Sequence, residues 1–241
     1  MKYIFLSPHF DDVVFSCGGL IWELTQRGDD VAVWTITTAK PNLTNLSPFA
    51  AQLHQRWGSL LDAVDVRMAE DSRAAQILGF RQKWFPVLDC IYRRAKDGTF
   101  LYDSESSLFG DLNPEDDALI EWLANELKAL RKSKVQLISP LGVGHHVDHQ
   151  LTRKAAEASG LPLWFYAEVP YILKHADWQT KWLIALSPVL NQTISPQAVH
   201  YWQKAAAAYA SQISTFWSDE IILQEDLQRL VNQGWGGFLW G

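Results

Sequence analysis

Short apolar segments alternate with helical patterns through most of this chain. Segments of strand length with apolar or β-branched character lie at residues 3–6, 31–37, 84–87, 135–138 and 163–167. Helical patterns lie at residues 12–27, 53–78, 114–130 and 147–158. Alternation of this kind needs a helical crossover between strands, so it predicts a mostly parallel sheet with helices on both faces. The expected fold is therefore α/β and Rossmann-like.

The part of the chain beyond residue 167 has a less regular pattern. Helices are expected at residues 196–211 and 218–232, and a glycine-rich, turn-forming tail at 234–238. No segment has the composition of a linker, and 241 residues suit one large α/β domain. We therefore expect a single domain over residues 1–241. The polar segment 39–48 follows a strand and is a candidate lid or substrate loop.

Composition disfavours several classes of protein. Hydrophobic residues make up 48% and charged residues 20% of the chain, as in ordinary globular proteins. The formal net charge of −6 disfavours a nucleic acid as partner. Two cysteines are too few for a disulfide framework or a cysteine-rich zinc site. The apolar run at 3–6 is too short for a signal peptide and no segment reaches the length of a membrane span, so a cytoplasmic location is expected.

Two segments rich in histidine and aspartate each follow an apolar strand. Positions 7–12 read Ser-Pro-His-Phe-Asp-Asp and follow the strand at 3–6. Positions 145–149 read His-His-Val-Asp-His and follow the strand at 135–138. The carboxyl ends of parallel strands share one rim of a sheet, where such folds bind ligands. We therefore expect the two segments to meet in space although they lie far apart in the sequence.

The side chains of these segments are metal ligands of the nitrogen and oxygen type. Two histidines and one aspartate, with water, suit a catalytic Zn²⁺ that keeps an open position. His146 and His149 are three apart at the start of a helix and so share one face, while His145 is expected to face away. Asp148 lies between them and is placed to orient an imidazole through its ring N–H. A capping role alone would explain one aspartate at a helix N-terminus, but not Asp12 with its neighbours.

Both segments resemble the signatures of one enzyme family. Positions 7–12 resemble the His-Pro-Asp-Asp-Glu signature of the PIG-L/LmbE-like zinc N-deacetylases. Positions 146–149 resemble their second signature, His-x-x-His with Asp before the last His. Weaker similarities to the bacterial branch of the family lie at positions 17–19, 67–71, 89–93 and 204–212, so the resemblance spans most of the chain. Phe10 stands where the family usually has Pro, and Val13 where it often has Glu.

The resemblance implies a metal site and a base. It implies that His9, Asp12 and His149 bind one Zn²⁺ per chain, with other divalent transition metals left open. It makes Asp11 the general base that activates the attacking water. The departures at positions 10 and 13 remove neither a ligand nor the base, although they leave open any detail of the site that depends on the glutamate.

The same resemblance implies further roles. His146 would stabilise or protonate the tetrahedral intermediate, with Asp148 as its partner. Arg67 and Asp89 resemble family positions that contact sugar hydroxyls. The expected partner is therefore a small N-acetylated sugar, and a homo-oligomer is left open.

The expected function is that of a zinc-dependent hydrolase that removes an N-acetyl or other N-acyl group from an amino sugar or sugar conjugate. Two alternatives stay open. One is a metal-dependent hydrolase of another bond, such as a phosphoester, against which a single-metal ligand set with few basic residues nearby argues. The other is a non-catalytic carbohydrate-binding protein of the same fold. The acceptor sugar, the pathway and the oligomeric state are not determined by the sequence.

Overall fold

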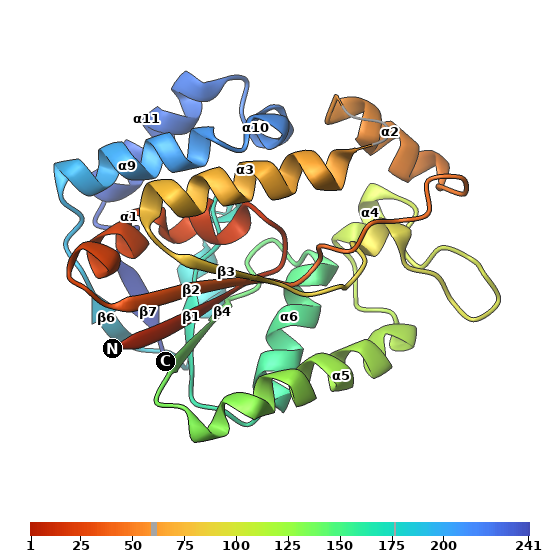
Figure 1. Ribbon diagram of the computed structural model, residues 1–241, viewed down its shortest axis with the longest axis horizontal. Helices are drawn as coiled ribbons and strands as arrows, with labels where there is room; N and C mark the ends of the chain where they lie inside the picture. The colour runs from red at the N-terminus through yellow and green to blue at the C-terminus, as the bar shows by residue number, and fades with distance from the viewer. Residues whose placement is uncertain (59–61, 176) are drawn as a thin grey trace.

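The computed structural model describes residues 1–58, 62–175 and 177–241. Its centre is a seven-stranded sheet with the strand order β3-β2-β1-β4-β5-β7-β6 (Figure 1). The strands are β1 (Lys2–Ser7), β2 (Asp30–Thr35), β3 (Arg81–Trp84), β4 (Gln136–Pro140), β5 (Leu163–Tyr166), β6 (Pro188–Asn191) and β7 (Phe238–Trp240). The first five strands pair in parallel, whereas β7 pairs antiparallel with both β5 and β6. The expected α/β, mostly parallel sheet is confirmed.

Helices cover both faces of this sheet. The α-helices are α1 (Asp12–Gln26), α2 (Pro48–Arg56), α3 (Ala63–Leu78), α4 (Glu105–Leu108), α5 (Asp117–Lys128), α6 (Val147–Ala158), α7 (Tyr171–Lys174), α8 (Trp178–Trp182), α9 (Pro196–Ala207), α10 (Ala210–Phe216) and α11 (Glu220–Asn232). Short 3₁₀ turns are η1 (Cys90–Tyr92), η2 (Pro114–Asp116) and η3 (Ala129–Lys132). In Figure 1, α1, α3, α9 and α11 lie on one side of the sheet, and α5 and α6 lie on the other.

Strand β1 shows why the sheet is buried on both faces. Tyr3 and Phe5 pack with the core under α1 and α9, whereas Ile4 and Leu6 pack with the core under α5 and α6. Alternate side chains of a strand point to opposite faces, so an unbroken apolar run suits a strand that is covered twice. β1 pairs with β2 on one side and with β4 on the other. The segments that follow β1 and β4 therefore emerge next to each other, as expected.

Helix α9 packs closely on the helix that follows β1. A Cβ atom added to Gly18 would lie 2.3 Å from Trp202 Cδ1, so the bare glycine lets the indole reach the backbone of α1. The Trp202 indole N–H donates a hydrogen bond of 2.7 Å to the carbonyl of Val14. The Cys-Gly-Gly segment at positions 17–19 thus serves the packing of α1, which carries the first His/Asp segment at its N-terminus.

Several elements differ from the sequence-based expectation. The strand expected at 84–87 spans Arg81–Trp84 instead. The backbone N–H of Phe85 still donates to the carbonyl of Thr35 at 2.8 Å, but the paired register with β2 ends at Trp84, and Phe85 and Val87 pack in the core beneath α5. The helix expected at 196–211 is broken into α9 and α10. Strands β6 and β7 were not predicted, and β7 begins at Phe238, the last residue of the segment that was expected to be a turn-rich tail.

Candidate active site

The first His/Asp segment forms a tight turn between β1 and α1. The Ser7 hydroxyl donates to the carbonyl of His9 at 2.5 Å and accepts the backbone N–H of Val13 at 3.2 Å. The Asp12 carboxylate accepts the backbone N–H of His9 at 2.7 Å. Asp11 occupies the N-cap position of α1 without a side-chain capping bond. A capping role therefore does not explain the two adjacent aspartates, whose carboxylates are both buried.

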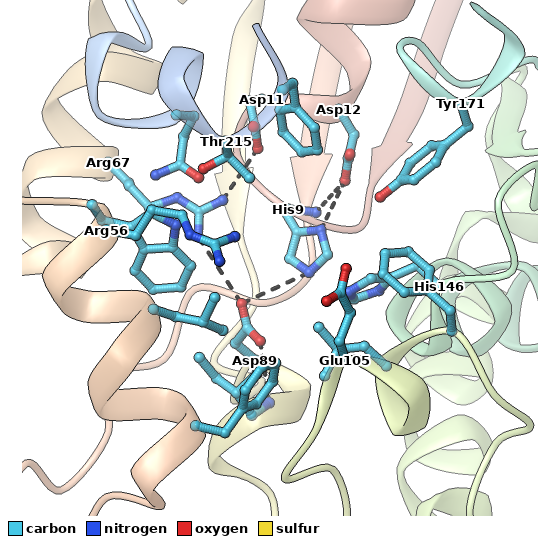
Figure 2. Close-up of a pocket in the computed structure, with 18 of the residues that line it drawn as sticks. His9, Asp11, Asp12, Arg56, Arg67, Asp89, Glu105, His146, Tyr171 and Thr215 are labelled. Carbon is cyan, nitrogen blue, oxygen red and sulfur yellow. Dashed lines mark hydrogen bonds and ion pairs between the residues drawn. The ribbon is translucent and has the colours of Figure 1, made fainter. Parts of the chain in front are cut away.

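The three expected metal ligands contact one another. Asp12 Oδ2 lies 3.1 Å from His9 Nδ1, and Asp12 Oδ1 lies 3.3 Å from His149 Nε2. Figure 2 shows His9 and Asp12 side by side at the floor of a pocket, joined by the dashed contacts. The two ends of the Asp12 carboxylate thus reach one imidazole from each segment. The expectation that segments far apart in the sequence meet at the rim is confirmed by these distances.

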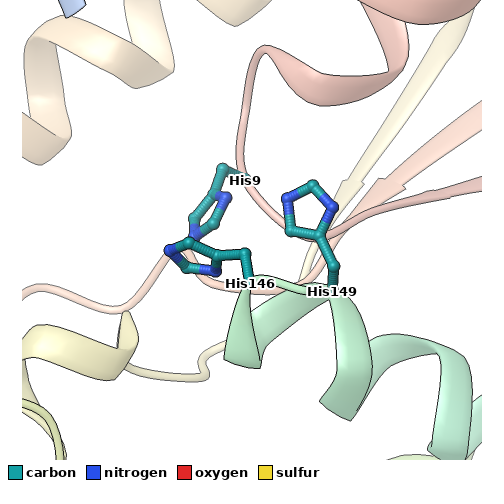
Figure 3. A group of neighbouring side chains, drawn as sticks. All are labelled: His9, His146 and His149. Carbon is teal, nitrogen blue, oxygen red and sulfur yellow. The ribbon is translucent and has the colours of Figure 1, made fainter. Parts of the chain in front are cut away.

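His146 and His149 project from the start of α6 toward His9, as Figure 3 shows. Their ring centroids lie 4.9 Å and 5.6 Å from that of His9, respectively. Ring nitrogens of all three histidines lie within 4.8 Å of one another, close enough to hold a metal ion. His145, by contrast, has an exposed side chain that lies 3.4 Å from Asp111. It therefore faces away from the site, as expected.

The residues present fit a zinc ion. His149 is fully buried, and within the described residues its Nε2 has no hydrogen-bond partner. A buried ring nitrogen without a partner is costly unless it binds something else. The atom faces the Asp12 carboxylate at 3.3 Å, so imidazole and carboxylate groups of the kind that bind zinc lie together here. Two other groupings of potential ligands include Asp148, whose charge is already paired with Arg93.

The two adjacent aspartates have opposite electrostatic surroundings. Burial raises the pKa of Asp11, and the Arg67 guanidinium, 3.1 Å away, counteracts part of that rise. Burial also works to raise the pKa of Asp12, but the imidazoles of His149 and His9 outweigh it and hold that pKa well below its usual range. Two carboxyl groups whose pKa values are moved apart are suited to different roles. Asp11 has the surroundings of a base and Asp12 those of a ligand.

Arg67 and Asp89 both line the same pocket. Asp89 Oδ2 lies 4.0 Å from Arg67 Nη1 and 3.7 Å from His9 Nε2. The Arg67 guanidinium stacks between the rings of Phe10 and Trp57, 5.5 Å from each centroid. The side chain that stands in place of the family's usual proline therefore supports Arg67 and does not obstruct the site.

The Asp148 carboxylate makes hydrogen bonds and an ion pair with residues outside the second His/Asp segment. It forms a short ion pair with the Arg93 guanidinium and accepts a hydrogen bond from the backbone N–H of Cys90 at 3.1 Å. It also lies 3.1 Å from His9 Nε2. Its contact with His146 runs through the backbone instead, since the N–H of Asp148 donates to His146 Nδ1 at 3.2 Å. The carboxylate therefore orients His9, and the main chain orients His146.

Sequence reasoning missed three residues around the site. Arg93 pairs with both Asp148 and Asp116 in the interior. Tyr171 lines the pocket and packs edge-on against the ring of His149 at 5.5 Å. Glu168 contacts His149 Nδ1 at 3.1 Å. Glu168 follows closely after a parallel strand, so the rule that sites form at strand ends could have identified it.

The pocket above these groups has a polar floor and an apolar wall. The floor holds the catalytic candidates, and the rim carries Arg56, Glu105 and Lys174. The wall is formed by the apolar and aromatic side chains of Phe49, Leu53, Trp57, Ile91, Leu108, Phe109 and Phe216. The wall residues on α2 begin directly after the expected lid segment at 39–48, and none of the pocket-lining residues belongs to that segment.

In this α/β fold, histidines and aspartates gather at the ends of parallel strands, where such folds place their active sites. The model of the family "PIG-L: GlcNAc-PI de-N-acetylase" matches residues 4–159, a stretch that includes both His/Asp segments, and the chain belongs to this family. It is thus an enzyme of the amide hydrolase class. Within the described residues, none of the helices is long and apolar enough to span a membrane.

Several known proteins of similar sequence or structure are deacetylases. The 2'-N-acetylparomamine deacetylase of Niallia circulans is 29% identical over 194 residues, covering 73% of this chain and 70% of that protein. The crystal structure of the zinc-inhibited form of teicoplanin deacetylase Orf2 has a TM-score of 0.84 at 24% identity, covering 100% of this chain and 97% of that one. N,N'-diacetylchitobiose deacetylase from Pyrococcus horikoshii has a TM-score of 0.58 at 17% identity, covering 100% and 83%. At these identities, the two structures support the fold alone.

Proposed function

We propose that this protein is a zinc-dependent N-deacetylase that hydrolyses the acetamide of an amino-sugar conjugate. The observation that carries the proposal is the Asp12 carboxylate placed between His9 and His149, with Asp11 beside it in an open pocket. His9, Asp12 and His149 would hold the metal. When bound there, Zn²⁺ would lower the pKa of a water molecule and polarise the amide carbonyl.

Asp11 is the proposed base. Its carboxylate lies in the pocket and accepts a proton from the attacking water. It then passes this proton to the nitrogen of the leaving amine. Burial raises the pKa of Asp11, which makes the carboxylate a better proton acceptor, while Arg67 keeps it from rising further. The ion pair with Arg67 also fixes where the carboxylate points.

His146 is the proposed donor to the oxyanion. Its Nδ1 accepts the backbone N–H of Asp148, so in the neutral ring the proton is on Nε2. Burial lowers the pKa of His146 well below its ordinary value, and the nearby His9 adds to that effect. A neutral ring with a fixed Nε2–H can donate a hydrogen bond to the oxyanion without carrying a charge. A single donor of this type typically stabilises a transition state by about 3 kcal/mol.

The pocket has a polar side and an apolar side, which supports a substrate in which a sugar is joined to an apolar group. Arg67 and Asp89 on the polar side supply hydrogen-bonding groups for hydroxyls, whereas Phe49, Trp57 and Phe109 form an apolar surface facing the same space. Aromatic rings bind both sugar faces and apolar aglycones. The similar proteins named above are deacetylases of a paromamine derivative, of teicoplanin and of a chitobiose, which also supports N-acetylated sugars and their conjugates.

Acetate release by metal-depleted protein, before and after zinc is restored, tests the proposal. We expect zinc to restore release of acetate from N-acetylglucosamine and, more strongly, from its p-nitrophenyl glycoside. The His9→Ala variant should release none, and bis-p-nitrophenyl phosphate should stay intact. Turnover of the phosphodiester without turnover of any N-acetyl sugar would replace this proposal with a phosphoester hydrolase. Binding of sugars with full zinc content and no turnover would indicate a carbohydrate-binding protein instead.

A further inference from the structure

Glu168 is a fully buried glutamate that contacts the ring of His149. It lies just beyond the end of β5, and its side chain is 0% exposed. Its Oε1 accepts the backbone N–H of Gly142 at 2.7 Å and lies 3.1 Å from His149 Nδ1, while Oε2 accepts the backbone N–H of Val143 at 3.2 Å. Three donors thus converge on one carboxylate that solvent does not reach.

We infer that Glu168 is a positioning residue that fixes the ring orientation and the tautomer of His149. The inference rests on the proposed function for the identity of the metal site. Because Glu168 accepts a hydrogen bond from His149 Nδ1, the lone pair of the neutral ring is on Nε2. That is the buried nitrogen with no hydrogen-bond partner in the described residues, and it faces Asp12. A carboxylate on the far ring nitrogen is a common support for a metal-binding histidine.

The same carboxylate also holds the loop that leads to His146. Gly142 and Val143 lie between β4 and α6, and both of their N–H groups donate to Glu168. At Gly144, in the same loop, a Cβ atom would lie 2.3 Å from Tyr171 Cδ1, so the bare glycine lets the loop pack directly against the Tyr171 ring. Glu168 therefore links the ring of one proposed metal ligand to the loop that carries the proposed oxyanion donor.

A glutamine cannot replace this carboxylate without loss. The side chain has the same shape, but one of its two terminal groups becomes an N–H₂ donor that faces either the N–H groups of Gly142 and His149 or that of Val143. Two hydrogen-bond donors that face each other in a buried position destabilise the folded state. The glutamine side chain would therefore turn away from the backbone N–H groups. Loss of such a support typically weakens metal binding about 10- to 100-fold.

Zinc affinity, measured by competition with a chromophoric chelator, tests the inference without relying on activity. We expect Glu168→Gln to bind zinc about 10- to 100-fold more weakly than the wild type. Glu168→Asp, which keeps the charge, should recover part of the loss. The matched control is Glu157→Gln on α6, whose half-exposed carboxylate pairs with Arg153 and should leave zinc affinity unchanged. Circular dichroism of each variant checks that the fold is retained.

Two spectra separate positioning from general damage. The visible spectrum of the Co²⁺-substituted protein should change in Glu168→Gln and stay unchanged in Glu157→Gln. In ¹⁵N-histidine spectra, the Nδ1–H proton of His149, assigned with a His149→Gln variant, should be protected from exchange in the wild type and lose protection in Glu168→Gln. This second readout works on metal-free protein, so it decides the inference even if the wild type binds no zinc. Unchanged protection, or unchanged affinity with an unchanged Co²⁺ spectrum, overturns it.

Discussion

The Arg67 guanidinium donates to the Asp11 carboxylate across 3.1 Å in the interior of the pocket. Both side chains are less than a tenth exposed, so the pair is shielded from water. The next residue along the chain, Asp12, contacts the imidazoles of His9 and His149. Two consecutive carboxylates are therefore separated into different surroundings by the turn that begins α1, as Figure 2 shows. Their separate roles can be tested one residue at a time.

The first prediction concerns the base. Asp11→Asn should retain about one zinc per chain and lose turnover by about 10²- to 10⁴-fold, because general-base catalysis typically contributes that much. Elemental analysis and acetate release measure the two quantities. Asp12→Asn is the matched variant and should lose the metal as well. If Asp11→Asn loses the metal and Asp12→Asn keeps it, the two roles have been exchanged.

The second prediction concerns the pH dependence of turnover. Arg67 holds down the pKa of Asp11, which burial raises, so Arg67→Ala should raise that pKa further. The base works in its ionised form, so the acidic limb of the kcat/KM profile should move to higher pH while zinc content stays unchanged. The acidic limb of Arg67→Lys should lie between those of the wild type and of Arg67→Ala. Arg73→Ala, an exposed cation on the same helix, is the control and should leave the acidic limb in place.

The third prediction concerns the metal ligands. His9→Ala and His149→Ala should each reduce zinc content from about one per chain to a small fraction, because each removes one of the three proposed protein ligands. His145→Ala removes a histidine from the same segment, but its ring faces Asp111 at the surface, so zinc content should be retained. Full metal content in both ligand variants would remove the basis of the assignment.

The fold was predictable where local pattern and tertiary role agree. β1 and β4 are short apolar runs that end at a polar segment, and a central strand buried on both faces has this pattern. β7 was missed because its residues, Phe238–Trp240, follow glycines and complete an antiparallel edge that depends on distant strands. The bounds of β3 were misplaced because Phe85 owes its apolar character to packing beneath α5. Sequence pattern does not distinguish burial against a helix from pairing in a sheet.

The meeting of the two His/Asp segments was predictable, but the residues that support them were not. His9, Asp12 and His149 drew attention because like residues cluster within two short segments, and their roles as metal ligands stay a prediction. Arg93 and Glu168 are single charged residues whose partners lie 55 and 19 positions away. Only the folded chain shows that each is buried against the site. The ion pair of Asp148 with Arg93 was missed for the same reason, because the cation lies outside the segment.

The last prediction concerns Asp71, a buried carboxylate on α3 outside the pocket. It accepts hydrogen bonds from the Trp84 indole at 2.8 Å, from the Gln82 amide and from the Tyr209 hydroxyl at 2.8 Å, and so ties α3 to β3 and to the segment between α9 and α10. Burial raises its pKa to about 6, against these hydrogen bonds, which work to lower it. In the unfolded chain the pKa returns to about 3.9, a difference worth roughly 3 kcal/mol.

Because the folded pKa lies above the unfolded one, the native state binds the proton more tightly. The contribution of the protonated group is fully present below about pH 4 and is lost as pH rises through about 6. Asp71→Asn has no such proton, and its amide can accept from Trp84 and Gln82 while donating to Tyr209. The free energy of unfolding of the wild type should therefore fall relative to Asp71→Asn by roughly 2 kcal/mol between pH 4 and pH 7. Urea unfolding of metal-free protein across this range measures the difference. Ser72→Ala changes no titratable group and should give a flat difference from the wild type, whereas a flat difference for Asp71→Asn would show that the carboxyl is not buried in the folded chain.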